Sequence, residues 1–371
     1  MSTSDDSRWM RRAIEVGAHG GKAVRPNPRV GCVLVRGGEE IASGYHDMCG
    51  GPHAEAIAVE IAGEAARGAT AYVTLEPCNH WGRTPPCAGA LIQAGVARVV
   101  IGVVDPHALA SGGAAALRVA GVEVELGVEA QAARELAEVF LTMTLENRAF
   151  VQCKLASSLD GRTAAADGTS RWLTSPEARQ LVHRWRAQAD AVLVGSGTAV
   201  TDDPRLDVRD LPELHALGLP LRIVLDRRLR LPATSHMADT TQQPTLVVCD
   251  DPEAAMGPAA DALRRRGVEI SCIPAQNDAS WLRAVLRSLK ERGLCHVLCE
   301  GGATLAGSLV REGLCDRLDV LLAPKLLGGG WPLLGDIGVA TLGDAPHYRF
   351  AAPQAVGADV WLTARPLREK L

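Results

Sequence analysis

Pro52-His53-Ala54-Glu55, Glu76-Pro77-Cys78 and Pro86-Cys87 are the stretches of this 371-residue chain that decide its fold and its chemistry. One histidine and two cysteines are ligands that suit zinc, and three protein ligands leave the fourth tetrahedral position open for water. The second cysteine follows the first after eight intervening residues, and each follows a proline in a polar, turn-rich stretch. The pattern predicts a zinc centre made by this histidine and these two cysteines.

The predicted ligands are His53, Cys78 and Cys87, and Glu55 lies too close to the histidine in sequence to be a comfortable fourth. Zinc lowers the pKa of a bound water to about 7, and Glu55 is placed to take the water proton and pass it to a leaving amine. A His-x-Glu pair followed by two spaced cysteines is typical of zinc deaminases, here with a longer cysteine spacing. The alternative is a structural zinc site with Glu55 exposed, but structural sites usually have four protein ligands.

Apolar strand patterns alternate with helix patterns along the first half of the chain. Helices are expected at 9–19, 54–66, 88–94, 114–120 and 130–145, and strands at 30–35, 40–45, 69–75, 97–103 and 122–126. This order predicts an α/β domain with helices on both faces of its sheet.

The pattern restarts after a long helix, with no Gly/Ser-rich linker. Strands are expected at 150–155, 191–194, 221–225, 245–249, 268–272, 296–299, 317–323 and 358–363, and helices at 176–187, 258–266, 280–292 and 304–312. We therefore predict two α/β domains, 1–146 and 147–371.

Composition limits the classes of partner. A net charge of −4 favours neither nucleic acid nor a membrane surface. No stretch approaches the ~20 apolar residues that span a bilayer, and residues 1–6 are polar, with no secretory h-region. We expect a cytoplasmic protein whose ten cysteines stay reduced.

Further motifs surround the predicted zinc ligands and continue through the second half. They are Pro26-Asn27-Pro28, Gly44-Tyr45-His46, Gly82-Arg83-Thr84-Pro85-Pro86-Cys87, Ser158-Leu159-Asp160-Gly161-Arg162-Thr163-Ala164, Asp202-Asp203-Pro204-Arg205-Leu206, Glu300-Gly301-Gly302 and Pro324-Lys325-Leu326-Leu327-Gly328-Gly329. In this order, and over essentially the whole chain, they resemble the bifunctional riboflavin-biosynthesis deaminase/reductase family.

The resemblance implies a cytidine-deaminase-like three-layer N-terminal domain that deaminates a diamino-ribosylaminopyrimidinone phosphate with one zinc per subunit. It also implies a dihydrofolate-reductase-like C-terminal domain that reduces the ribosyl group of the product to ribityl with NADPH. Substrate contacts in the deaminase are implied for Asn27, His46, His80 and Arg83.

On the reductase side the resemblance implies two sets of residues. The NADPH set is Ala156, Trp172, Thr198, Asp202, Gly302, Ala303, Thr304, Leu305, Ala306, Gly307 and Ser308, and the substrate set is Ser170, Arg186, Leu206, Arg209 and Glu300. Glycines that end a strand and open a helix leave backbone N–H groups free to cradle a phosphate, although each glycine run is equally an ordinary tight turn. Gly195-Ser196-Gly197 lacks the third glycine of the dinucleotide fingerprint, which disfavours a Rossmann domain.

The strand expected at 221–225 ends at Asp226-Arg227-Arg228. In a Rossmann enzyme an acidic residue there would favour the 2′-OH of NAD, but guanidinium groups bind phosphate with bidentate geometry. We expect the 2′-phosphate of NADPH to lie against Arg227 or Arg228. The alternative is a solvated basic turn.

Three positions depart from the family pattern. Residues 105–112 replace a usual Asp-Pro-Asn-Pro stretch, Ala303 stands where proline is usual, and Asp207 stands where threonine is common. A carboxylate at Asp207 beside the phosphate-binding Arg209 is expected to weaken substrate binding.

Two other functions stay open from the residues alone. The chain could be a zinc deaminase of another heterocycle with an unrelated reductase domain, or an inactive zinc-stabilised scaffold. The intact Glu55 and the open coordination position count against the scaffold. We expect small phosphorylated pyrimidines as substrates and a homo-oligomer, dimer or tetramer, formed through the reductase domain.

Overall fold

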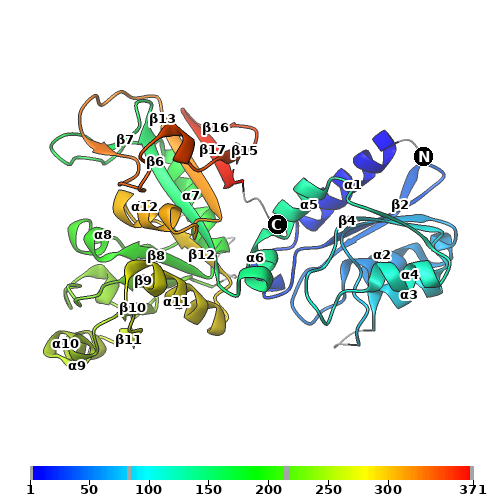
Figure 1. Cartoon of the computed structure of the whole chain (residues 1–371), viewed down its shortest axis with the longest axis horizontal. Helices are drawn as coiled ribbons and strands as arrows, with labels where there is room; N and C mark the ends of the chain where they lie inside the picture. The colour runs from blue at the N-terminus through cyan, green and yellow to red at the C-terminus, as the bar shows by residue number, and fades with distance from the viewer. Residues whose placement is uncertain (1–2, 82–84, 210, 212–217, 368–371) are drawn as a thin grey trace. The chain divides into compact units, whose positions relative to one another are not determined.

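The structure is a computed structural model that describes residues 3–81, 85–209, 211 and 218–367. The chain folds into two compact units, Met1–Asn147 and Arg148–Leu371 (Figure 1). The division falls one residue after the boundary expected from the sequence.

The N-terminal unit is built on a five-stranded sheet of order β2-β1-β3-β4-β5. Its strands are β1 (Gly31–Arg36), β2 (Glu39–Tyr45), β3 (Thr70–Leu75), β4 (Arg98–Val103) and β5 (Glu123–Leu126), and its helices are α1 (Thr3–Gly17), α2 (Ala54–Ala62), α3 (Cys87–Ala94), α4 (Gly113–Val119), α5 (Ala130–Leu136) and α6 (Glu138–Glu146). Strand β1 runs antiparallel to β2 and β3, whereas β3, β4 and β5 are parallel.

Helices cover both faces of this sheet, as expected, with α1 and α5 on one side and α2, α3 and α4 on the other (Figure 1). The alternation of side chains along β1 explains the arrangement. Val33 and Val35 pack against α1, and Cys32 and Leu34 pack in the core beneath α2 and α3.

The helices of this unit differ from the expectation in three places. Helix α1 begins at Thr3 and not at residue 9, and α2 ends at Ala62, where a 3₁₀ helix over Gly63–Ala66 follows it. The third difference is a break in a helix. The segment predicted as a single helix over 130–145 is two helices that meet at Ala137, whose φ and ψ of −94° and 9° interrupt the helix. Alanine is the strongest helix former, so the residue type at this position does not indicate the break.

Helix α1 is tied to the sheet by a buried carboxylate. Arg98 of β4 donates from Nη1 to Asp6 Oδ1 over 2.7 Å, and the Tyr72 hydroxyl of β3 donates to the same oxygen over 2.8 Å. The hydrogen bond from Arg98 lowers the pKa of Asp6 below its ordinary value, although burial opposes it.

The C-terminal unit contains a larger sheet, of order β11-β10-β9-β8-β12-β6-β13-β17-β15, with β16 paired to β17 and a separate β14-β7 pair. Its strands are β6 (Phe150–Ser158), β7 (Arg162–Ala164), β8 (Ala191–Gly195), β9 (Leu221–Leu225), β10 (Thr245–Cys249), β11 (Glu269–Cys272), β12 (His296–Cys299), β13 (Arg317–Ala323), β14 (Trp331–Pro332), β15 (Tyr348–Phe350), β16 (Gln354–Val356) and β17 (Asp359–Pro366). Its helices are α7 (Pro176–Gln188), α8 (Ser196–Thr201), α9 (Pro252–Met256), α10 (Pro258–Arg264), α11 (Asp278–Glu291) and α12 (Ala303–Arg311). The short elements β7, β14, β15, β16, α8 and α9 were not predicted, because elements of this length depend on their tertiary partners more than on a local pattern.

In the sheet order given above, all neighbouring strands from β11 through β6 to β13 are parallel. Strand β17 is antiparallel to both of its neighbours, β13 and β15. Val192 and Val194 face the core shared with α7, while Ala191 and Leu193 face the core shared with α11 and α12. Burial on both faces explains the continuous apolar runs of these strands. Because β9, β8, β12 and β6 are parallel, their carboxyl ends meet at one edge of the sheet.

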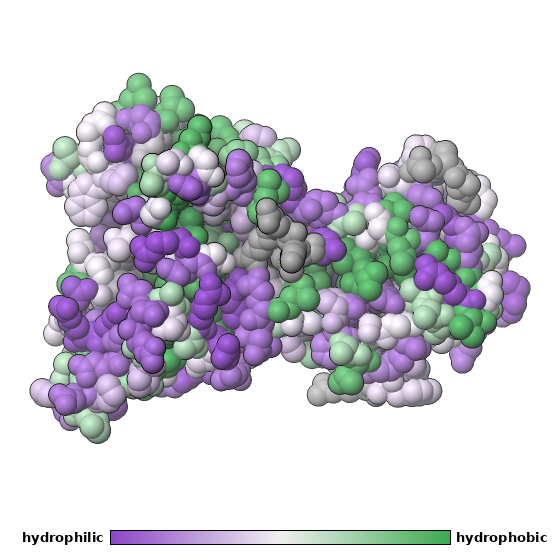
Figure 2. Space-filling model, viewed as in Figure 1, coloured by the Kyte–Doolittle hydropathy of each residue, from purple (hydrophilic) through white to green (hydrophobic). Residues whose placement is uncertain are grey.

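No helix within the described residues is long and apolar enough to cross a bilayer. Hydrophilic residues cover much of the viewed face of the C-terminal unit around α9, α10 and β11 (Figure 2).

We predict that Asp6→Ala lowers the free energy of local unfolding of α1 by about 2–3 kcal/mol at pH 7, because Arg98 and Tyr72 lose a charged acceptor. The measurement is hydrogen–deuterium exchange of α1 peptides in the full chain. Since the folded pKa of Asp6 is depressed, the difference from wild type should shrink as the pH falls below the ordinary value of 3.8.

The matched control is Glu15→Ala on the same helix, whose pair with Arg12 is exposed and should contribute no more than about 1 kcal/mol. Equal exchange in the two variants at pH 7 would show that Asp6 does not anchor α1.

Candidate active sites

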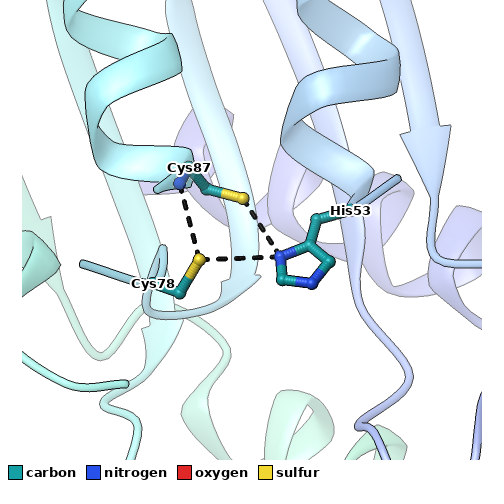
Figure 3. A group of neighbouring side chains, drawn as sticks. All are labelled: His53, Cys78 and Cys87. Carbon is teal, nitrogen blue, oxygen red and sulfur yellow. Dashed lines mark hydrogen bonds between the residues drawn. The ribbon is translucent and has the colours of Figure 1, made fainter. Parts of the chain in front are cut away.

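Three segments of the N-terminal unit bring His53, Cys78 and Cys87 together (Figure 3). His53 is the N-cap of α2, Cys78 follows the carboxyl end of β3, and Cys87 is the first residue of α3. Their ligand atoms all lie within 4.8 Å of one another.

The geometry of this cluster fits zinc. His53 Nδ1 lies 3.2 Å from Cys87 Sγ and 3.6 Å from Cys78 Sγ. In a tetrahedral site with Zn–S near 2.3 Å and Zn–N near 2.0 Å, a sulfur and a nitrogen ligand are roughly 3.6 Å apart. Among the described residues this is the one group of His, Cys, Asp and Glu with such spacing.

Local electrostatics favour a thiolate at this cluster. The Cys87 thiol and the His53 ring both donate hydrogen bonds that lower the pKa of Cys78, and the Cys87 backbone N–H donates to the same sulfur over 3.4 Å. Two helices begin at these residues, and their N-termini carry partial positive charge. Low thiol pKa and a helix N-terminus are the conditions under which cysteine binds metal well.

Glu55 lies in the first turn of α2, only 3% exposed, and lines a cavity of about 410 Å³ together with His53 and Cys78. Burial raises the pKa of Glu55 to about 7. A carboxyl group with a pKa near neutrality can both accept and donate a proton.

Asn27 and His46, both predicted from the family resemblance, form a hydrogen-bonded chain on the wall of this cavity. His46 Nδ1 lies 2.9 Å from the Pro52 carbonyl, and Asn27 Nδ2 lies 3.1 Å from His46 Nε2. The contacts fit a neutral ring that donates from Nδ1, and burial lowers the pKa of His46 in agreement. His80 also lines the cavity, and Arg83 lies outside the described residues.

Glu76 organises the cavity, although no role was predicted for it from the sequence. Its Oε2 accepts from the Asp105 N–H, and its Oε1 accepts from the N–H groups of Gly112 and Ala114, at 2.9–3.2 Å. A Cβ on Gly113 would lie 1.8 Å from the Pro77 carbonyl oxygen, so only glycine fits beside the Cys78 segment. The sequence feature that could have indicated this role is the acidic residue directly before Pro77-Cys78.

Two adjoining cavities follow the carboxyl edge of the large sheet. The first, of about 870 Å³, extends from the residues after β9 past α8 to the start of α12. The second, of about 820 Å³, lies beside β6 and α7. Both are lined by Thr163, Ser170, Gly302 and Ala303, so they form one continuous groove.

The predicted NADPH residues divide between these cavities. Thr198, Asp202, Gly302, Ala303, Thr304, Leu305 and Ser308 line the first, whereas Ala156 and Trp172 line the second. Ala306 and Gly307 lie on the buried side of α12 and line neither. Helical periodicity explains this, since a run of seven residues cannot face one side of a helix.

Among the predicted substrate residues, Glu300 and Arg186 form a largely buried pair. Arg186 donates from Nε and Nη2 to the two Glu300 oxygens at 2.5 and 2.9 Å. Burial opposes ionisation, but Arg186 keeps the pKa of Glu300 below its ordinary value. Ser170 and Arg209 also line the groove, while Leu206 is 4% exposed and lies in the core.

Lys154 was missed from the sequence. It lines the second cavity from β6, close enough to Glu300 and Arg186 to sense both charges, and burial lowers its pKa. A lysine inside the apolar strand pattern at 150–155 was the signal.

Arg209 and Arg227, two arginines expected to bind phosphate groups, both form ion pairs with carboxylates. Arg209 Nε lies 3.0 Å from Asp207 Oδ1. Arg227 Nε lies 3.2 Å from Asp250 Oδ2, and its Nη2 lies 2.8 Å from Asp278 Oδ1.

Comparison with protein families matches each unit separately. Residues 3–103 match the cytidine and deoxycytidylate deaminase zinc-binding region, and residues 149–362 match the RibD C-terminal domain. The second match covers more than half of the chain.

Whole-length relatives agree. The chain is 39% identical to the riboflavin biosynthesis protein RibD of Aquifex aeolicus over 96% of this chain and 97% of that one. The structure of Acinetobacter baumannii RibD is 38% identical, with a TM-score of 0.80 over 99% of this chain and 100% of that one. A diaminohydroxyphosphoribosylaminopyrimidine deaminase/5-amino-6-(5-phosphoribosylamino)uracil reductase from Thermotoga maritima is 33% identical, with a TM-score of 0.80 over 98% and 99% of the two chains.

We predict that Cys87→Ser loses most of its zinc, because the site then keeps two strong protein ligands of three. The zinc content of the purified protein, measured by elemental mass spectrometry, tests this prediction. Cys32→Ser is the control, since Cys32 is a buried core residue of the same unit and lies outside the cluster. Full zinc retention in Cys87→Ser would contradict the ligand assignment.

Proposed function

Because this chain belongs to the RibD family of riboflavin-biosynthesis deaminase/reductases, we propose that its N-terminal unit deaminates and its C-terminal unit reduces. The protein is a bifunctional enzyme with a zinc-dependent deaminase activity and an NADPH-dependent reductase activity. Its substrates are small phosphorylated pyrimidines. The observation that carries the assignment of the first activity is the three-ligand cluster beside the buried Glu55.

In the deaminase, His53, Cys78 and Cys87 would hold zinc, which supplies a water acidic enough to attack at neutral pH. With zinc bound, Glu55 would carry one water proton to a ring nitrogen as the C–O bond forms and the second to the amine as the C–N bond breaks, so that ammonia and a ring carbonyl result. Its buried position and its pKa near 7 support both transfers.

Substrate positioning in this cavity falls to polar groups on its walls. The contact with the Pro52 carbonyl fixes the His46 ring, and the ring in turn orients the Asn27 amide. The Asn27 side chain is therefore placed to read the polar edge of the pyrimidine. His80 stands at the exposed rim, where the sugar phosphate would extend.

In the reductase, NADPH supplies a hydride, and its orientation follows from the groove. The substrate cavity adjoins β6 and α7, and the four residues that both cavities share would hold the nicotinamide. The start of α12 lines the first cavity, Gly302 caps this helix without a side-chain hydrogen bond, and the first N–H groups of the helix would hold the pyrophosphate. The residues after β9 would hold the adenosine end.

The proposed roles at the substrate end of the groove belong to four of its charged residues, Glu300, Arg186, Lys154 and Arg209. Glu300 accepts hydrogen bonds from sugar hydroxyls in the orientation that Arg186 fixes. Lys154, whose pKa is lowered by burial, gives a proton to the ribose ring oxygen as the ring opens. Arg209 holds the phosphate, in competition with Asp207.

We also propose that the protein acts in the cytoplasm as a homo-oligomer formed through the reductase unit. The ten cysteines all lie in the described part of the chain and form no disulfide there, which fits a protein of a reducing compartment. Exposed apolar side chains on the last strands, Phe350 of β15 and Val360 of β17, support a contact between copies there. Sedimentation velocity on Phe350→Glu should show dissociation to a smaller species.

We predict that Glu55→Gln lowers ammonia release by about 10²–10⁴-fold, because a carboxamide cannot carry the proton. The same variant should oxidise NADPH at the wild-type rate when given the deaminated substrate. Glu300→Gln is the reciprocal variant, which should release ammonia normally and lose NADPH oxidation.

Zinc content and thermal unfolding of both variants control for loss of structure. If Glu55→Gln keeps its zinc and its fold but releases ammonia at a near-normal rate, Glu55 is not the proton carrier. If either folded variant loses both activities, the division of labour between the units is wrong.

A further inference from the structure

The adenosine end of the cofactor groove contains a charged cluster that the mechanism above does not use. Arg227, after β9, is paired with Asp250, after β10, and with Asp278, the first residue of α11. Its guanidinium also lies over the Trp281 ring, with Cζ 4.5 Å from the ring centroid. Arg227 is 37% exposed as a side chain, and Asp278 and Trp281 line the same groove.

These contacts make Arg227 a poor anchor for the 2′-phosphate. One guanidinium and two carboxylates give this cluster a net charge of −1, which repels a dianion. Two of the donor nitrogens, Nε and Nη2, already face carboxylates. What the cluster offers the groove is a flat, fixed, π-rich surface, since the planar guanidinium is clamped at its edge and backed by an indole.

The neighbouring arginines have different surroundings. Arg228 and Arg230 are exposed and line the groove, and Arg230 Nη2 lies 2.5 Å from the Ser196 hydroxyl. Asp226 is fully buried, and its Oδ2 accepts from the Leu231 N–H over 2.8 Å, so it closes the turn and does not reach a ribose. Arg230 Nε lies 3.9 Å from Asp226 Oδ1, and the two arginines with this one buried carboxylate leave a net charge of +1 on this side of the groove.

We propose that Arg227 is the platform on which the adenine stacks, and that Arg228 and Arg230 hold the 2′-phosphate. The proposal rests on the NADPH-dependent activity of the reductase unit. It divides the cofactor preference between two neighbouring residues: Arg227 binds any adenine nucleotide, and Arg228 with Arg230 selects the phosphorylated one. Base stacking on flat side chains tolerates any ligand that carries the base, whereas a guanidinium–phosphate contact requires the phosphate.

The test is equilibrium binding to the full-length enzyme, with NADPH and NADH followed by fluorescence and 2′,5′-ADP and 5′-AMP used as competitors. Arg227→Lys keeps the charge and loses the flat surface, so all four ligands should bind about tenfold more weakly. Arg228→Ala should weaken NADPH and 2′,5′-ADP by about tenfold or more and leave NADH and 5′-AMP unchanged. Arg265→Ala, an exposed arginine outside the groove, is the control and should change nothing.

The reverse pattern would overturn the proposal: Arg227→Lys affecting only the phosphorylated ligands, or Arg228→Ala affecting all four equally. Unchanged binding in both variants would also overturn it. Wild-type enzyme that binds no NADPH would instead contradict the reductase assignment itself. Thermal unfolding midpoints within a degree or two of wild type keep these outcomes separate from misfolding.

Discussion

Parallel strand pairing is the constraint on which both sites depend, because it sets carboxyl ends side by side at one edge of a sheet. In the N-terminal unit, β3 and β4 deliver the Cys78 segment and the loop that Glu76 clamps. In the C-terminal unit, β9, β8, β12 and β6 line up the residues along which the cofactor groove runs. Helices that begin at these edges then add partial positive charge and free N–H groups.

The two sites meet different electrostatic demands with this edge. In the deaminase cavity, burial outweighs the hydrogen bonds and the nearby His53 charge that favour ionisation of Glu55, so its pKa rises to about 7, where it can exchange protons. The reductase pairs its acid, and Arg186 keeps Glu300 ionised as an acceptor. A carboxyl group that transfers protons needs burial to raise its pKa, whereas a carboxylate that only accepts hydrogen bonds needs a cationic partner to keep it ionised. The N-terminal unit provides the first condition and the C-terminal unit the second.

Sequence patterns predicted what depends on residue type and local order. The α/β class and the family resemblance are confirmed. The side chains of His53, Cys78 and Cys87, which the sequence singles out, lie together in the structure, and their role as zinc ligands stays a prediction. The roles of Glu76 and Lys154 were not evident, because their partners lie far away in the sequence and only folding brings them close. The ion pairs of Arg227 were not predicted for the same reason. The burial of Ala306 and Gly307 was not predicted either, because a contiguous motif does not indicate which residues of a helix face inward.

The clamp at Glu76 has a consequence for how this enzyme can change over generations. All three groups that Glu76 binds in the 105–114 loop are main-chain N–H donors, and every residue except proline offers one. The side chains between them, His107, Ala108 and Leu109, are exposed and have no part in that attachment. The exposed tip of the loop can therefore change in sequence while Glu76 still holds both ends of the loop, whereas Gly113, where only glycine fits, cannot change.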